Sequence, residues 1–171
     1  WDGYVHVNAA SPTGYQPKKW YVPYEHRSKI DQSDNPKNII FMRYASVLLY
    51  LAEAANEIGS TGDALMYLEQ VRSRARSNAQ GSGVLPEITE TDKQQLREII
   101  WHERRVEMAC EGQRFWELAR QERAGEVMRN YSEEYDSYKG QYFVDGVNEI
   151  FPIPRNQVDL SDGTMEQNPG Y

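Results

Sequence analysis

Between residues 40 and 76, hydrophobic residues recur every three or four positions, as they do along one face of an α-helix. The first series comprises Ile40, Tyr44, Val47, Leu48, Leu51, Ala55 and Ile58. It predicts a helix that begins at Asn35-Pro36 or Asn38 and ends at Gly59, because glycine commonly terminates helices. The second series, within residues 63–76, comprises Ala64, Leu65, Leu68, Val71 and Ala75. The short link at residues 59–62 makes the two helices an antiparallel hairpin.

Small residues occur in this hairpin where two helices would cross closely. The pattern is an i, i+3, i+4, i+7 series followed by a pair four residues apart: Leu48, Leu51, Ala52 and Ala55, then Ala64 and Leu68. This layout is typical of a tetratricopeptide repeat. A plain helical hairpin explains the same spacing, and a single repeat does not decide between the two.

Further helices are predicted after a polar linker at residues 77–90. A capping box at Thr91-x-x-Gln94 predicts a third helix over 92–111, and a short helix is expected over 113–121 after Gly112. Residues 151–154 (FPIP) are expected to be extended, because a residue before proline is kept out of the α region. The expectation is one all-α domain over 1–171, with tetratricopeptide-like hairpins and long ordered loops.

Within that domain, three regions are expected. Residues 1–37 form an aromatic loop region, residues 38–125 a helical core, and residues 126–171 an irregular and extended C-terminal tail. No run of 18 apolar residues is present, and no signal-peptide pattern opens the chain. The chain is therefore expected to be cytosolic or to have its export signal outside this sequence.

The net charge of the 171 residues is −7, and no basic run is longer than two residues, as at Lys18-Lys19. A nucleic-acid backbone would be repelled overall, so no nucleic-acid partner is predicted. Cys110 is the single cysteine, which excludes an internal disulfide.

Two glutamates fall within the apolar face of the third helix. That face is defined by Leu96, Ile99, Ile100, Val106 and Cys110. At 100° per residue, Glu103 and Glu107 lie in the middle of it, where an unpaired charge would be very costly. Arg72 lies on the apolar stripe of the second helix, and Arg114 lies just past the glycine break. We therefore expect a structural ion network of Arg72, Glu103, Glu107 and Arg114.

A catalytic interpretation of the same residues is weaker. Glu103 and Glu107 could act as the acid and nucleophile of a glycosidase, but helix-borne carboxylates among aliphatic residues are more often structural. His102-Glu103 begins a zincin-like motif, yet Val106 stands where the second histidine is required. No phosphate loop, dinucleotide fingerprint or nucleophile elbow occurs. The sequence therefore predicts no enzyme, no metal site and no cofactor.

Aromatic residues outside the helices are candidates for ligand binding. Flat rings beside amides and carboxylates suit sugars, because the apolar face of a pyranose stacks on Trp or Tyr. The candidates are Trp1, Tyr4, Tyr15, Trp20 and Tyr24. The alternative is that these rings pack the loop onto the helices.

Several segments together resemble the C-terminal part of the SusD/RagB family. They are residues 11–15 (SPTGY), 18–21 (KKWY), 42–57 (MRYASVLLYLAEAANE), 68–75 (LEQVRSRA), 102–118 (HERRVEMACEGQRFWEL), 151–154 (FPIP) and 167–171 (QNPGY). The resemblance covers the chain from about Ser11 to its last residue. It is carried by scaffold motifs, so no ligand-binding residue is transferred from the family.

The resemblance implies a non-catalytic, glycan-binding surface protein with a tetratricopeptide-like scaffold. Such proteins are anchored in the outer membrane by a lipid, which would lie outside this chain, and deliver nutrients to a SusC-like TonB-dependent transporter. Family members are usually about three times as long, so the chain is expected to be a C-terminal portion. The alternatives are a tetratricopeptide-like protein-interaction scaffold and, less favoured, the glycosidase.

Overall fold

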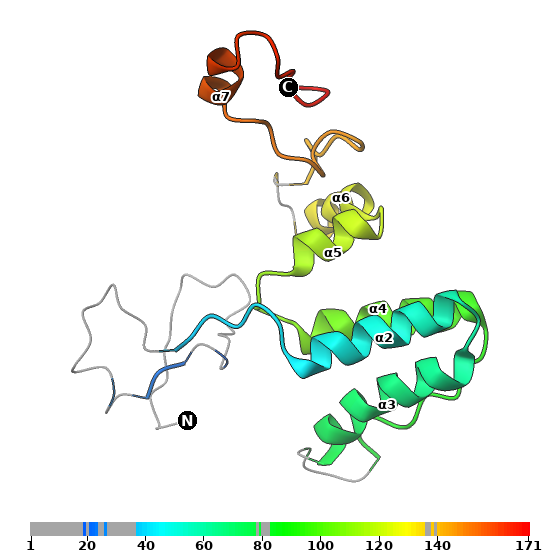
Figure 1. Cartoon of the computed structure of the whole chain (residues 1–171). Helices are drawn as coiled ribbons and strands as arrows, with labels where there is room; N and C mark the ends of the chain where they lie inside the picture. Colours follow the sequence, from blue (N-terminus) through cyan, green and yellow to red (C-terminus); the bar gives the residue numbers. More distant parts are fainter. Residues whose placement is uncertain are drawn as a thin grey trace. The chain divides into compact units, whose positions relative to one another are not determined.

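The computed structural model describes residues 19, 21–23, 26, 37–77, 79, 83–135, 138 and 140–171. Every regular element in these ranges is a helix (Figure 1). The helices are α2 (Tyr44–Glu57), α3 (Thr61–Ser77), α4 (Lys93–Glu107), α5 (Arg114–Arg120), α6 (Ala124–Glu134) and α7 (Arg155–Leu160). The predicted all-α class is confirmed. The chain divides into two compact units, Trp1–Glu111 and Gly112–Tyr171, so the single domain over 1–171 stays a prediction.

The hairpin of α2 and α3 is present, and its turn has a clear physical basis. The amide of Ser60 donates to the carbonyl of Ala55 at 2.8 Å, and the amide of Gly59 donates to Asn56 at 3.1 Å. This pair of bonds is a Schellman motif, which requires the left-handed conformation that Gly59 adopts at φ 82°. The Ser60 hydroxyl then donates to Asp63 at 2.7 Å in the first turn of α3.

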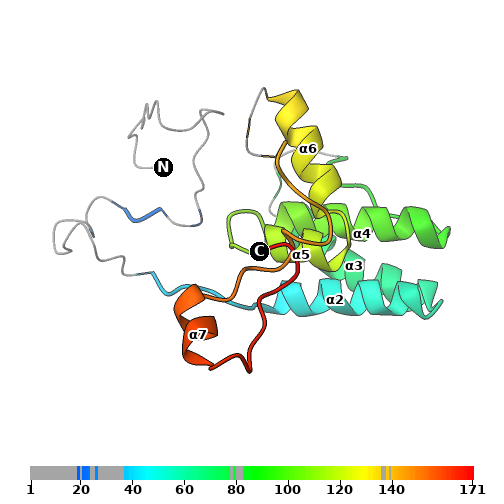
Figure 2. The same ribbon diagram turned by 90° about the horizontal axis from the view of Figure 1, so that it is seen from above.

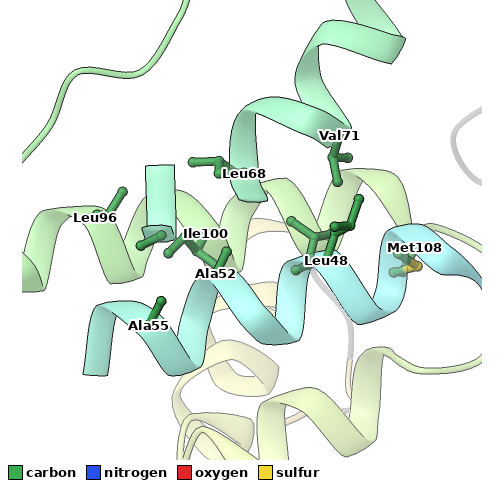
Figure 3. Close-up of a cluster of buried hydrophobic side chains, with 10 residues drawn as sticks. Leu48, Ala52, Ala55, Leu68, Val71, Leu96, Ile100 and Met108 are labelled. Carbon is green, nitrogen blue, oxygen red and sulfur yellow. The ribbon is translucent and has the colours of Figure 1, made fainter. Parts of the chain in front are cut away.

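The core of the first unit lies among α2, α3 and α4. Figure 3 shows their side chains pointing toward one another. The buried members are Leu48, Leu49, Ala52, Ala55, Ala64, Leu68, Val71, Leu96, Ile100 and Met108. Ala52 and Ala64 are completely buried, and small side chains at these positions let the helices approach closely. This is the close packing that the tetratricopeptide-like spacing predicts. One predicted member differs: Leu51 is 41% exposed, and Leu49 is buried in its place.

The start of α2 differs from the sequence expectation. The helix begins at Tyr44, although the apolar spacing predicted a start at residues 35–38. Arg43 is extended (φ −139°, ψ 165°), and its guanidinium binds Glu107 and Glu111. Arg43, the residue directly before the helix, thus contacts residues more than 60 positions away in the sequence. The spacing of apolar residues within one segment carries no information about such contacts.

The bounds of α4 also differ from the expectation. Its N-cap is Asp92, whose side chain accepts from the amide of Gln95 at 2.9 Å, so the predicted Thr91/Gln94 box is wrong by one residue. Aspartate is a stronger cap than threonine. The helix ends at Glu107 instead of residue 111, because Cys110 (φ 66°) and Gly112 (φ 76°) are left-handed.

The second unit contains two helices where residues 126–171 were expected to be irregular and extended. One is α6, which continues to Glu134, and the other is α7. Pro154 serves as the N-cap of α7, since its fixed φ is compatible with entry into a helix. The segment after α6 folds back along that helix (Figure 2), where Arg129 forms an ion pair with Asp145 at 2.9 Å.

Candidate functional site

The predicted ligand-binding aromatic residues lie outside the described part of the chain. They are Trp1, Tyr4, Tyr15, Trp20 and Tyr24. Their role in ligand binding stays a prediction. The structure does describe Lys19, which directly precedes Trp20, and the ion network that holds it.

The buried pair in this network joins α3 to α4. Arg72 Nη1 lies 2.5 Å from Glu103 Oε2, and the two side chains are 9% and 8% exposed. A second guanidinium nitrogen, Arg72 Nη2, donates to the carbonyl of Pro86 at 2.9 Å. Arg72 therefore satisfies Glu103 in the apolar interface and also fixes the linker that leads to α4. This contact is the one that the helix periodicity predicts.

Glu107 binds two arginines that the sequence analysis did not assign to it. Its Oε1 accepts from Arg43 Nη1 at 2.5 Å and from Arg74 Nη2 at 2.8 Å. Arg114 belongs to the second unit, and its predicted pairing with Glu103 or Glu107 stays a prediction. Arg43 comes directly before α2 and Arg74 from α3, so Glu107 connects all three helices of the core.

Glu111 extends the network beyond the end of α4. Arg43 Nε lies 3.0 and 3.1 Å from its two carboxylate oxygens, and Lys19 Nζ lies 2.6 Å from Oε1. Burial alone would raise the pKa of Glu111, but hydrogen bonds from Arg43 and Lys19 outweigh it and lower the pKa below its usual value. Burial acts to lower the pKa of Arg43, yet its two glutamate partners raise it overall. Each group is thus held in its charged form.

The network ties two distant segments to α4. Lys19 Nζ also donates to the carbonyl of Glu107 at 2.6 Å, and Lys37 Nζ donates to the carbonyl of Lys19 at 3.1 Å. The side chain of Lys19 is therefore bound to the end of α4, and its backbone carbonyl is bound to Lys37.

The carboxylates on α4 are engaged in a way that suits a scaffold. Glu103 and Glu107 each accept at least one charged hydrogen bond from arginine. A glycosidase needs one carboxyl free to protonate the leaving group. Within the described ranges, no group of three His, Cys, Asp or Glu side chains could hold a metal ion.

Two aromatic residues of the first unit also take part in polar contacts. Trp101 Nε1 donates to the buried carboxylate of Glu53 at 2.8 Å. The guanidinium carbon of Arg104, which is almost fully buried, lies 3.7 Å from the ring centroid of Tyr50. Both contacts join α2 to α4, so these rings serve packing.

In the second unit, the FPIP segment contacts α5 through the ring of Phe151, which is still 62% exposed. The ring of Phe151 lies 6.1 Å from Phe115 and 5.6 Å from Trp116, measured between centroids. The Gln167 amide pairs with the backbone of Ile153 in both directions at 2.8 Å. The C-terminal residues thus hold the extended segment in place.

Side-chain hydrogen bonds hold the end of the chain at Tyr171 and Asn168. The Tyr171 hydroxyl donates to the carbonyl of Ile150 at 2.9 Å, and Asn168 Nδ2 donates to the carbonyl of Phe151 at 2.8 Å. Tyr171 is still half exposed, so hydrogen bonds contribute more than burial. The terminal residues 168–171 (NPGY) are therefore joined by hydrogen bonds to the backbone of residues 150 and 151.

The sequence analysis missed Lys19, Arg43, Arg74 and Glu111 as members of the network. One signal was available: Glu111 continues the i, i+4 series of Glu103 and Glu107. Arg43 carried no comparable signal, because the expected helix included it and its extended conformation became visible only in the structure.

The chain is similar to the SusD family throughout, since the model of that family matches residues 3–171. It is 34% identical to SusD-like protein P38 of Formosa agariphila over 126 residues, which are 73% of this chain and 25% of that protein. It is 32% identical to SusD-like protein P2 of the same organism over 143 residues, 81% of this chain and 27% of that protein. The chain therefore spans about a quarter of the length of these relatives.

A solved structure gives the same result. A SusD homolog from Bacteroides thetaiotaomicron matches 77% of this chain and 26% of its own length, with a TM-score of 0.69 and 29% sequence identity. The helical architecture described above is thus shared with a protein of known structure.

Proposed function

The chain belongs to the SusD family, and from that premise we propose that it contributes to a nutrient-binding protein that captures glycans and passes them to a SusC-like TonB-dependent transporter. The observation that carries the proposal is the family match over residues 3–171 together with the matching helical fold. Because the chain spans about a quarter of its relatives, the activity concerns the protein of which this sequence forms the whole or a part.

The ion network supports a scaffold role for the first unit. Glu107, at the end of α4, binds Arg74 of α3 and Arg43, which directly precedes α2. Glu111 binds Arg43 and Lys19. A binding site gains affinity when its support is rigid before the ligand arrives. In this proposal α4 is the fixed support, and the aromatic segment around Trp20 supplies ligand contacts.

We further propose that the protein is non-catalytic. Both carboxylates of the glycosidase alternative are held by arginines, which leaves neither placed as a free acid. Binding without cleavage also suits delivery, because a transported oligosaccharide has to leave the protein intact.

The proposed location is the cell-surface side of the outer membrane, through a lipid anchor outside this sequence. Among the described helices, none has the length and apolar character needed to cross a bilayer. A lipid anchor would supply the attachment in this proposal.

Affinity electrophoresis of the full-length protein through gels containing neutral polysaccharides tests the proposal. The expected result is retardation in at least one polysaccharide, together with copurification of a TonB-dependent transporter from membranes. Copurification with a different protein and no retardation in any gel would favour the protein-interaction scaffold. Release of reducing ends that Glu103→Gln and Glu107→Gln abolish would favour the glycosidase.

A further inference from the structure

Tyrosine side chains gather at the end of α6 and in the segment that follows it. Tyr131 and Tyr135 stack with their ring centroids 4.8 Å apart. They are 46% and 58% exposed, and Tyr138 and Tyr142 are 69% and 75% exposed. Tyrosine is usually of intermediate burial in proteins, and exposed aromatic groups of this kind commonly mark binding surfaces.

The segment that carries these tyrosines is fastened to α6 at Gly140. The Gly140 amide donates to Ser132 Oγ at 2.7 Å, and the Ser132 hydroxyl donates to the carbonyl of Met128 at 3.2 Å. A Cβ at Gly140 would overlap the Met128 carbonyl, so only glycine permits this approach. Tyr138 and Tyr142 are each two residues from Gly140, which places their Cα atoms within about 7 Å of it.

A second attachment lies farther along the same segment. Arg129 binds the Asp145 carboxylate at 2.9 and 3.3 Å and also donates to the carbonyl of Phe143 at 3.4 Å. The Asn148 side chain accepts from the amide of Val144 at 2.7 Å. Tyr142 is therefore held between two fixed points, and little order has to be imposed when a ligand binds.

The negatively charged residues around these rings favour neutral ligands over anionic ones. Residues 129–145 contain four carboxylates, one arginine and one lysine, and the arginine, Arg129, is already paired with Asp145. Glu134, three residues after Tyr131 along α6, is exposed, and its carboxylate can accept hydrogen bonds from hydroxyl groups. The carboxylates of this segment repel sulfate and uronate groups.

We propose that Tyr131, Tyr135, Tyr138 and Tyr142 form a binding surface for neutral oligosaccharides, separate from the aromatic candidates near the start of the chain. The pyranose rings stack on the exposed tyrosine faces, and their hydroxyls donate to Glu134. This inference rests on the glycan-binding function proposed above and specifies its ligand class.

Hydroxyl-radical footprinting of the full-length protein measures the solvent accessibility of these tyrosines directly. The probes are cellohexaose, maltohexaose and mannohexaose, with hexagalacturonate as the anionic comparison. We expect at least one neutral probe to protect the peptides carrying Tyr131 to Tyr142 from oxidation. Tyr44, which is exposed on the first unit, should be oxidised equally with and without the probe.

Calorimetry on variants completes the test. Tyr131→Ala and Tyr142→Ala should each weaken binding of the protecting probe by about tenfold, as loss of a stacking anchor does. Tyr142→Phe keeps the ring and should bind within about twofold of the unaltered protein. Tyr44→Ala is the matched control and should change nothing.

The other outcomes overturn the inference in distinguishable ways. Equal binding by Tyr131→Ala, Tyr142→Ala and Tyr44→Ala would remove this surface while leaving the proposed function standing. Tighter binding of hexagalacturonate than of the neutral probes would refute the proposed ligand class. Binding of none of the neutral probes would refute it as well. Loss of transporter copurification in Tyr142→Ala with unchanged glycan binding would show that the surface contacts a protein instead.

Discussion

Arg72 donates to Glu103 across the interface of α3 and α4, with 2.5 Å between Nη1 and Oε2 and both side chains more than nine-tenths buried. The two charged side chains lie between α3 and α4, in the unit whose core is otherwise formed by apolar side chains. Desolvation of two charges offsets much of their attraction, so the pair adds little net stability, but leaving either charge alone is costly. This relationship makes the pair sensitive to one-sided substitution.

The first prediction follows from that asymmetry. Glu103→Ala should lower the free energy of unfolding by about 3–5 kcal/mol, because it strands the Arg72 charge in the core. Glu98→Ala, at an exposed position of the same helix, should cost under about 0.5 kcal/mol. The double variant Arg72→Met/Glu103→Leu should recover most of the loss. Equal, small losses for Glu103→Ala and Glu98→Ala in urea unfolding would contradict the buried pair.

The core makes a second prediction through two leucines of α2. Leu49 is completely buried and Leu51 is 41% exposed. Leu49→Ala should cost about 2–5 kcal/mol, through lost burial and the cavity left behind. Leu51→Ala should cost under about 1.5 kcal/mol. Thermal unfolding of both variants checks the difference, and a larger loss at Leu51 would place the core on the wrong face of α2.

A third prediction concerns acid. Arg97 binds both carboxylate oxygens of Glu57, at 2.5 and 2.6 Å. The hydrogen bond from Arg97 lowers the pKa of Glu57 from 4.5 to about 2. The pair stabilises the fold fully above the unfolded value of 4.5, and this contribution is lost as the pH falls toward 2.

Titration of the Glu57 carboxyl by NMR checks this directly. The midpoint should lie near 2, and in Arg97→Gln it should move upward toward 4.5. Because the Glu57 side chain is 38% exposed, solvent screening limits the effect on stability to about 1 kcal/mol. An unchanged midpoint in Arg97→Gln would disprove the pairing.

The fourth prediction concerns the C-terminal residues. Gln167 pairs with the amide and the carbonyl of Ile153. Gln167→Ala should speed hydrogen exchange at the Ile153 amide and lower stability by about 1–3 kcal/mol, because backbone groups lose their partners. Gln157→Ala, at an exposed position of α7, is the control. Unchanged exchange at Ile153 would contradict the pairing.

The helical hairpin and the Arg72–Glu103 pair could be predicted from the sequence because both depend on local periodicity. The start of α2 could not be predicted, because the side chain of Arg43, the extended residue before it, binds Glu107 and Glu111. The tyrosine-bearing segment shows the same limit. Tyr131, Tyr135, Tyr138 and Tyr142 recur every three or four positions in the sequence, but the bond from the Gly140 amide to Ser132 joins residues eight positions apart. Contacts between residues far apart in the sequence determine where these elements begin and how they pack, and local patterns do not reveal such contacts.

The central claim is that the protein binds glycan without cleaving it. Isothermal titration calorimetry of the full-length protein with the neutral oligosaccharide that protects the tyrosines tests this most directly. We predict heats that saturate and return to the baseline after every injection, with the oligosaccharide recovered intact. Absence of any heat, or a sustained heat flow with new reducing ends, would contradict the claim.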